Sequence, residues 1–275
     1  MKLIGDSCLD LTPELKERLE ITQVPLTISL KDISHLDDEN LDLPQLLEDI
    51  RNCDEKVITA APSPALFREA FEGDDEVFVV TLSSNLSGSY QSAMIAKNDF
   101  EEEGKGKVHV FNSKSASAGE ILTALKIREL INNNETMKNI ISTVEDFISN
   151  LKTYFVLDDI STLVKNGRLN KIVGTIITTL GIKPLMGTDK EGNIMLAGHS
   201  RSETQTIKKM LEFVTKSGKD TANRLMVITH CNNLSLAKRI MEVAIEKFNF
   251  AEILIVPTGG LSSVYANEGG VIMAF

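Results

Sequence analysis

The residues best placed to do chemistry follow one apolar strand. The run Val77–Thr81 is almost continuously apolar and β-branched, which is typical of a strand buried on both faces of a parallel sheet. A short turn follows, and a helix is expected over Ser87–Asp99. Free N–H groups at a helix start, the helix dipole and nearby hydroxyls together suit an oxyanion. The turn residues concerned are Ser84, Ser87, Gly88 and Ser89, and Gly88 has no Cβ to block a close approach.

An ordinary serine-capped helix start is the competing interpretation of this turn. Two further strand ends carry polar residues that could join it. Asp6 and Ser7 follow the expected strand Lys2–Ile4, and Thr59 lies at the end of the expected strand Val57–Ala60. In parallel sheets the carboxyl ends of strands are where binding sites form. The alternative is that Asp6 and Ser7 only order their turn and that Thr59 is structural.

Two arginines, Arg168 and Arg201, are candidates for binding a ligand or a partner. Arg168 follows an Asn-Gly turn at 166–167, where its guanidinium could bind a carboxylate through two hydrogen bonds, or could cap a helix C-terminus. Arg201 ends the run His199-Ser200-Arg201 after the expected strand Asn193–Ala197, and surface charge is its alternative role.

Several kinds of enzyme site lack the residues they need. The chain has no Gly-Lys-Ser/Thr phosphate loop, no GxGxxG after its first strand and no G-x-S-x-G elbow. Its four histidines are scattered and do not pair with a serine and an acid by spacing, so we predict no catalytic residues. Cys8, Cys53 and Cys231 are widely spaced, which predicts free thiols in a reducing cytoplasm and no metal site.

Composition narrows the class of protein further. The chain has 275 residues, of which 42% are hydrophobic, with a net charge of −10. Such an acidic chain is a poor match for nucleic acid. No apolar run approaches the roughly 20 residues of a membrane-spanning helix, so no integral membrane contact is expected.

Short apolar strands alternate with longer amphipathic segments, which indicates an α/β fold with parallel pairing. From about residue 151 the pattern changes to short helical pieces and a strand pair around the turn Asp189–Asn193. We therefore expect an N-terminal α/β/α sandwich with a parallel sheet over residues 1–155. A two-layer α/β domain with a mixed sheet would follow over residues 156–275, with a ligand between the two.

Six segments in order resemble the motifs of the DegV family of fatty-acid-binding proteins, across essentially the whole chain. The segments 5–11, 59–64 and 82–93 are similar to T-D-S-T-x-D-L, T-S-Q-P-S-P and L-S-S-x-L-S-G-T-Y-Q-S-A. The segments 110–115, 163–169 and 182–184 are similar to V-I-D-S-K-S, L-x-K-G-G-R-I and I-K-P. Each motif is weak alone, and their shared order makes coincidence an inadequate explanation.

The resemblance implies the EDD fold and a cytoplasmic, bacterial, non-catalytic carrier subunit of a fatty-acid kinase. A long-chain fatty acid would lie between the domains with its carboxylate held by Thr59, Ser87, Gly88 and Arg168, and no other cofactor would be needed. Arg201 matches an arginine implicated in docking to the kinase, which would convert the presented carboxylate to an acyl phosphate.

Two departures from the family pattern affect the predicted site. Ala60-Ala61 replaces Ser-Gln, and Tyr265 stands where the family has the histidine of H-T-G-x-G-A, so Tyr265 joins the predicted carboxylate site as a neutral donor. A weaker head-group site or a different ligand would follow. A lipid-dependent sensor module and a small-carbonyl activity related to dihydroxyacetone kinases are the alternatives. The second would need a histidine in the site.

Overall fold

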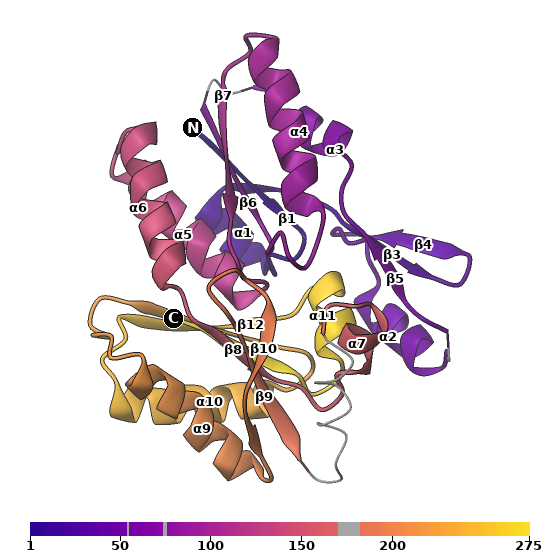
Figure 1. The fold of residues 1–275 in the computed structure, drawn as a ribbon, viewed down its shortest axis with the longest axis vertical. Coiled ribbons are helices and arrows are strands. Elements are labelled where there is room, and N and C mark those ends of the chain that lie inside the picture. Colours follow the sequence, from indigo (N-terminus) through magenta and orange to yellow (C-terminus); the bar gives the residue numbers. More distant parts are fainter. Residues whose placement is uncertain (54, 74–75, 170–181) are drawn as a thin grey trace.

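The computed structural model describes residues 1–53, 55–73, 76–169 and 182–275. Its strands form a four-stranded, a six-stranded and a three-stranded sheet. Figure 1 shows the four-stranded sheet in the upper part of the view and the six-stranded sheet below it. The three-stranded sheet projects to one side.

The four-stranded sheet is parallel throughout, in the order β2-β1-β6-β7. Its strands are β1 (Lys2–Asp6), β2 (Ile21–Val24), β6 (Glu76–Thr81) and β7 (Lys107–Asn112). The alternating residues of β6 divide between two hydrophobic clusters, because Phe78 and Val80 face one side and Val77 and Val79 the other. Burial on both faces explains the continuous apolar run in its sequence.

Helices cover both faces of this sheet. On one face lie α3 (Pro64–Ala70) and α4 (Ser89–Glu102), which contribute Phe67 and Phe100 to a cluster with Val79. On the other lie α1 (Pro13–Leu19), α5 (Ala118–Asn132) and α6 (Met137–Asn150). The parallel sheet and these helices therefore form the predicted α/β/α sandwich, whereas the three-stranded sheet and α2 (Leu43–Arg51), from the same half of the chain, lie outside it.

The six-stranded sheet is mixed, in the order β10-β9-β8-β13-β11-β12, and only the pair β11–β12 is parallel. Its strands are β8 (Thr153–Val156), β9 (Lys183–Thr188), β10 (Ile194–Ser200), β11 (Leu225–His230), β12 (Glu252–Pro257) and β13 (Val271–Ala274). The predicted turn at Asp189–Asn193 joins β9 to β10 as a hairpin. One face packs against α9 (Glu203–Lys216) and α10 (Leu234–Lys247).

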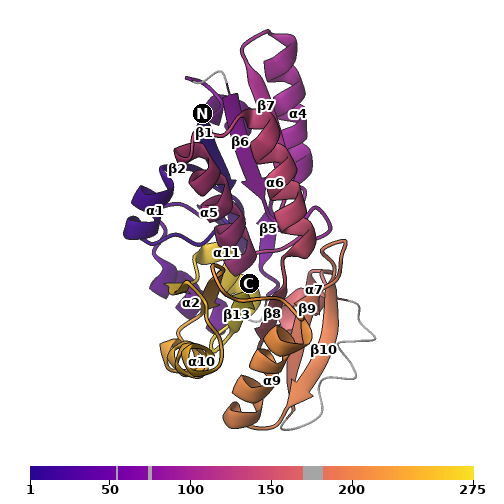
Figure 2. The same ribbon diagram turned by 90° about the vertical axis from the view of Figure 1, so that its left-hand side faces the viewer.

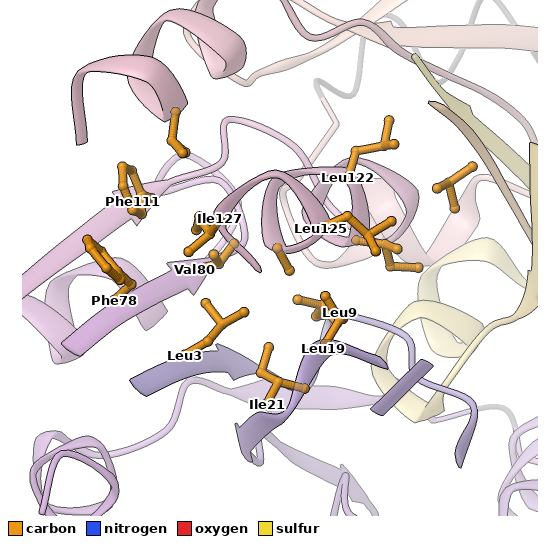
Figure 3. Close-up of a cluster of buried hydrophobic side chains, with 14 of the residues drawn as sticks. Leu3, Leu9, Leu19, Ile21, Phe78, Val80, Phe111, Leu122, Leu125 and Ile127 are labelled. Carbon is orange, nitrogen blue, oxygen red and sulfur yellow. The ribbon is translucent and has the colours of Figure 1, made fainter. Parts of the chain in front are cut away.

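Helix α5 links the two sheets. Its side chains pack with Leu3 and Phe78 of the parallel sheet and with Val227 and Ala274 of the mixed sheet, in one hydrophobic cluster. Figure 3 shows Leu122, Leu125 and Ile127 of this helix among the side chains from the parallel sheet and α1. Figure 2 shows α5 in the middle of the molecule, where it contacts β1 and β6 of the parallel sheet and β11 and β13 of the mixed sheet.

Beside the cavity lies the three-stranded antiparallel sheet of β3 (Thr27–Leu30), β4 (Ile33–Leu36) and β5 (Ile58–Ala60), in the order β4-β3-β5. Helices α2 (Leu43–Arg51), α7 (Ser161–Lys165) and α11 (Gly260–Ala266) pack near it. The sequence did not predict β4 or α11, and it predicted one interrupted strand over 22–30 where the structure has two.

Other predicted bounds need correction by a few residues. The helix expected over Ser87–Asp99 runs from Ser89 to Glu102, because Ser87 and Gly88 belong to the turn. The predicted helix Lys171–Leu180 lies outside the described residues.

Candidate functional site

An apolar cavity lies between the two larger sheets and has about 710 Å³ of space between its lining atoms, its mouth included. Leu82, Leu86 and Ala116 line it from loops of the parallel sheet, and Phe155 and Ile272 line it from the mixed sheet. The further apolar lining residues are Leu157, Leu163, Ile194, Leu261 and Ala266. This lining has the chemistry to contact a long apolar molecule.

A polar depression adjoins the cavity, and Leu86 and Arg168 line both. The depression is lined by the turn between β6 and α4 and by the 166–168 segment after α7. Ser87, Gly88 and Asn166 are among its residues. An amphipathic molecule could thus keep its polar end in the depression and its apolar end in the cavity.

Thr59 and Tyr265 meet beside this mouth, although 206 positions separate them in the chain. Their hydroxyl oxygens are 2.7 Å apart and share a hydrogen bond. Asn166 Nδ2 donates to the Tyr265 hydroxyl at 3.4 Å and to the Val57 carbonyl at 3.2 Å. Because Thr59 is on β5 and Tyr265 on α11, this contact joins the three-stranded sheet to the wall of the cavity.

Arg168 supplies positive charge at the mouth. Its Nε donates to the Leu86 carbonyl at 3.0 Å, and Nη1 donates to the Asn166 carbonyl at 2.7 Å. The guanidinium carbon lies 6.0 Å from the centre of the Tyr265 ring. Within the described residues Arg168 forms no ion pair. The two backbone carbonyls fix its position and leave its charge without a carboxylate partner in that part of the chain.

The turn between β6 and α4 matches the predicted oxyanion site only in part. Gly88 is the N-cap of α4 and no side chain caps this helix. Ser87 Oγ accepts a hydrogen bond from the Ser89 amide at 3.2 Å. A Cβ on Gly88 would meet only Ala61 Cβ, at 3.7 Å, so the protein itself does not require glycine there. Ser87 and Gly88 therefore border open space at the start of a helix.

Two other serines of the turn, Ser84 and Ser89, form hydrogen bonds with side chains of the protein itself. Ser89 Oγ donates to Asp6 Oδ2 at 2.6 Å, and Ser84 Oγ accepts from Asn112 Nδ2 at 2.7 Å. Asp6 also accepts hydrogen bonds from the amides of Leu82 and Cys8.

Ser7 accepts from the Leu26 amide at 3.0 Å. For both Asp6 and Ser7 the structural interpretation is the correct one: they order the turns around the site and do not line it.

Polar atoms also occur on the inner wall of the cavity, at Cys8, Ser117 and Ser262. Ser117 Oγ donates to Asp10 Oδ2 and shares a hydrogen bond with Thr229 Oγ1. The other Asp10 oxygen accepts from the Gly259 amide at 2.7 Å. These hydrogen bonds satisfy the inner polar groups within the protein, so the inner wall offers a ligand mainly apolar contact.

A group of buried acids lies behind that wall. Burial raises the pKa of Asp6 to about 6 and that of Asp10 to about 7. Glu120 is fully buried, and neither carboxyl oxygen has a hydrogen-bond partner. Burial raises the Glu120 pKa well above its ordinary value, and the charge of Asp6 raises it further. Burial without a hydrogen-bond partner among the described residues therefore favours the neutral form of this carboxyl.

Arg201 is exposed after β10 and lines neither the cavity nor the depression. None of the four histidines lines either space. Within the described ranges, no group of three or more His, Cys, Asp or Glu side chains could hold a metal ion. In the same residues no helix is both long and apolar enough to cross a bilayer.

Sequence reasoning missed several residues that the structure places at or near the site. Asn166 was only part of an Asn-Gly turn, and its bond to Tyr265 depends on a contact across 99 positions. Asp37 was not considered, yet its carboxylate accepts from the amides of Gly260 and Leu261 and so fixes the start of α11, which carries Tyr265. A buried acid capping a distant helix leaves no local signal in the sequence.

Comparison with known proteins agrees with this geometry. The family model described as "Uncharacterised protein, DegV family COG1307" matches residues 1–275. A curated DegV domain-containing protein of Streptococcus pneumoniae is 33% identical over 279 residues, covering 100% of this chain and 98% of the relative.

Two solved structures are similar over the whole chain. A DegV family protein from Ruminococcus gnavus, solved with vaccenic acid, has a TM-score of 0.93 and 37% identity, with 100% of this chain and 99% of that one covered. The fatty acid kinase (Fak) B3 protein of S. pneumoniae, loaded with linoleic acid, has a TM-score of 0.92 and 33% identity, with 100% and 98% covered.

These relatives hold fatty acids as ligands, which agrees with the prediction of a non-catalytic lipid-binding chain. The match of fold, the order of motifs and the full-length family match all lead to one assignment. The chain belongs to the DegV family.

Proposed function

We propose that this chain binds a long-chain fatty acid in the apolar cavity and presents its carboxylate at the mouth to a partner kinase. One observation carries the proposal: an apolar cavity opens beside a fixed guanidinium, that of Arg168, which no carboxylate of the described residues neutralises. Ser87 and Gly88 line the depression, Tyr265 lines the cavity, and Thr59 lines neither but shares a hydrogen bond with the Tyr265 hydroxyl.

The division of binding energy follows from the chemistry. A C16 chain buries about 15 methylenes at roughly 0.8 kcal/mol each, or about 12 kcal/mol before the costs of association. Each hydrogen bond to the charged carboxylate adds roughly 1.5–3 kcal/mol before desolvation. The cavity would therefore supply most of the affinity, and the mouth would set the orientation of the ligand.

The kinase step completes the proposal. A carboxylate held at an open depression is accessible to a second protein, and an acyl phosphate is the product of phosphoryl transfer to it. Arg201, exposed after β10 and outside the ligand site, is the residue we assign to kinase docking. Because a kinase draws on cytoplasmic nucleotide, the proposal also places the chain in the cytoplasm.

The test begins with protein purified from a bacterial host, denatured and analysed by mass spectrometry for fatty acid. We expect a stoichiometric fatty acid, and delipidated protein should rebind palmitate or oleate. The double variant Thr59→Val/Ser87→Ala should bind at least tenfold more weakly. The matched control Ser142→Ala/Thr143→Ala, which removes two exposed hydroxyls of α6, should bind like wild type.

The kinase step is measured separately, as acyl phosphate formed with ATP and a fatty-acid kinase catalytic subunit. Arg201→Glu should lower this rate without changing fatty-acid affinity. Protein that is empty and also fails to take up either acid would overturn the binding proposal. Normal turnover with Arg201→Glu would instead favour a lipid-dependent sensor.

A further inference from the structure

A second, polar pocket lies behind the wall of the apolar cavity, and Thr153 and Thr188 line both spaces. The space between its lining atoms is about 330 Å³ when the open solvent at its mouth is included, and it is formed where three distant segments meet. These are the loop after β7, the end of α6 with its connection to β8, and the turn of the β9–β10 hairpin. We call it the lysine pocket, after Lys114, Lys152 and Lys190, one from each segment.

The three ammonium groups have no protein partner in the described part of the chain. None of them forms an ion pair or donates a side-chain hydrogen bond to a residue there. Each of the three segments thus contributes one lysine, without an ion-pair partner among the described residues, to the lining of the pocket.

Asp189 is the acid that lines the pocket, and it is used in holding the hairpin turn. Its Oδ1 accepts from the amides of Glu191 and Asn193, each at 2.9 Å, and the Asn193 side chain donates to both of its oxygens. The side-chain hydrogen bond from Asn193 is the first cause that keeps the Asp189 pKa below its ordinary value. The carboxylate is thus committed to the turn.

The positive charge of Lys152 also acts on a neighbouring lysine, Lys219. Lys219 donates to the Asn150 carbonyl and so occupies the C-terminal end of α6. Its pKa is lowered to about 8 by burial and then by the positive charges of Arg224 and Lys152. Since Lys219 already serves the helix end, capping of α6 does not account for Lys152.

The frame of the lysine pocket is rigid. Lys114 has a left-handed backbone, with φ of 51°. Its amide donates to Asn112 Oδ1 at 3.1 Å, and the Ser115 amide donates to Ser113 Oγ at 3.2 Å. Ser115 Oγ and Thr153 Oγ1 share a hydrogen bond of 2.7 Å across the segments. The serine hydrogen bonds hold the segments of the lysine pocket together, and the three lysine side chains take no part in them.

We propose that the lysine pocket binds a tetrahedral oxyanion, a free phosphate or the phosphate of a small ester, through Lys114, Lys152 and Lys190. Lysine ammonium groups bind phosphate as point charges with several N–H donors each. Three of them with one committed carboxylate leave an excess of two positive charges, which matches a phosphate dianion. The inference does not rest on fatty-acid binding in the neighbouring cavity.

The test is a titration of the full chain with inorganic phosphate, followed by calorimetry in a low-salt, phosphate-free buffer. Sodium chloride at equal ionic strength is the reference. We expect saturable binding at one site, weakened at least tenfold in Lys114→Ala/Lys152→Ala. The matched control Lys238→Ala, which removes an exposed lysine of α10, should bind like wild type. Glycerol phosphate forms a second arm, and tighter binding than that of phosphate would identify an ester as the ligand.

Thermal unfolding in phosphate-free buffer checks that the double variant folds. If it does not, Lys190→Ala at the exposed hairpin tip replaces it, and we expect about threefold weaker binding. Wild-type protein with no saturable phosphate binding would overturn the proposal. Undiminished binding in the folded lysine variants would overturn it equally.

Discussion

Tyr265 is the residue at which this chain departs most clearly from the family motif, and the structure shows what the phenol does. Its hydroxyl lies 2.7 Å from Thr59 Oγ1 and accepts from Asn166 Nδ2. A neutral phenol can donate one hydrogen bond to a carboxylate, whereas a protonated histidine would add a charge. The orientation of Thr59 therefore depends on Tyr265.

Removing only this hydroxyl gives a sharp test. Tyr265→Phe should weaken fatty-acid binding by about tenfold, since a hydrogen bond to a charged group contributes roughly 1.5–3 kcal/mol. Tyr265→His should bind more tightly as the pH is lowered through about 6.5, where an unperturbed imidazole gains its charge. Fluorescent fatty-acid titrations between pH 5.5 and 8 measure both effects. Equal fatty-acid affinity of wild type and Tyr265→Phe would show that the Tyr265 hydroxyl does not bind the carboxylate.

At the scale of elements, α5 depends on a glycine in its first turn. A Cβ at Gly119 would lie 2.0 Å from Ser115 Oγ and 2.9 Å from Thr153 Oγ1. Neither neighbour can easily move, because the two hydroxyls bond each other and both side chains are buried. This contact sets how closely α5 approaches the strand β8.

Gly119→Ala should lower the free energy of unfolding by about 1–3 kcal/mol, the usual cost of overpacking. The clash outweighs the gain of up to about 1 kcal/mol that alanine brings to a helix. The matched control is Gly198→Ala in β10, where a Cβ would have ordinary contacts at 3.9 and 4.0 Å. Urea denaturation measures both variants, and equal midpoints for the two would contradict the argument.

Elements with a strong local pattern were the ones that the sequence predicted well. The expected strand Lys2–Ile4 lies within β1, and the apolar run Val77–Thr81 lies within β6, which begins only one residue earlier. The helix α11 was missed because it begins with two glycines, and its start is held by Asp37 from far along the chain. Its stability comes from tertiary contacts that no window of sequence contains.

Prediction of the site residues was limited in the same way, because their partners lie far away in the sequence. Strand-end reasoning proposed Ser87 and Gly88, which line the depression after the parallel strand β6, and Thr59, which lies on a strand of the antiparallel sheet and lines neither space. It also proposed Asp6 and Ser7, which the structure uses to order turns. Sequence alone could not separate these two roles, because a polar residue after a strand looks the same whether its partner is a ligand or a backbone amide.

For the whole molecule, the buried acids link stability to pH. Asp6 and Asp10 have pKa values of about 6 and about 7 in the folded protein, above their ordinary 3.8, and burial, together with the charge of Asp6, also raises the pKa of Glu120. The folded state therefore binds protons more strongly than the unfolded state. Their contribution is fully present below pH 3.8 and is lost as the pH rises through 6 and 7.

We expect the free energy of unfolding to fall by a few kcal/mol between pH 5 and pH 8, at about 1.4 kcal/mol per unit of pKa shift. Glu120→Gln, neutral at every pH, should reduce this slope and raise stability at pH 8. The control Glu102→Gln, at an exposed position of α4, should keep the wild-type slope. Urea titrations across this pH range measure the effect, and a wild-type slope in Glu120→Gln would refute it.

The contacts of the β9–β10 hairpin make its tip a poor place to label this protein. Hairpin tips are usually tolerant places for a reporter, yet Ser83 Oγ donates to the Gly192 carbonyl at 2.9 Å and Asn85 Nδ2 donates to the Glu191 carbonyl at 2.8 Å. A Cβ at Gly192 would strike Ser83 Oγ at 2.4 Å. A fluorophore or peptide inserted at this tip would pull on the turn that leads to Ser87. The exposed loop around Gly104 offers open space, since a Cβ there would meet no atom within 4 Å, but Gly104 itself has a φ of +70° and should be kept, so an insertion belongs beside it.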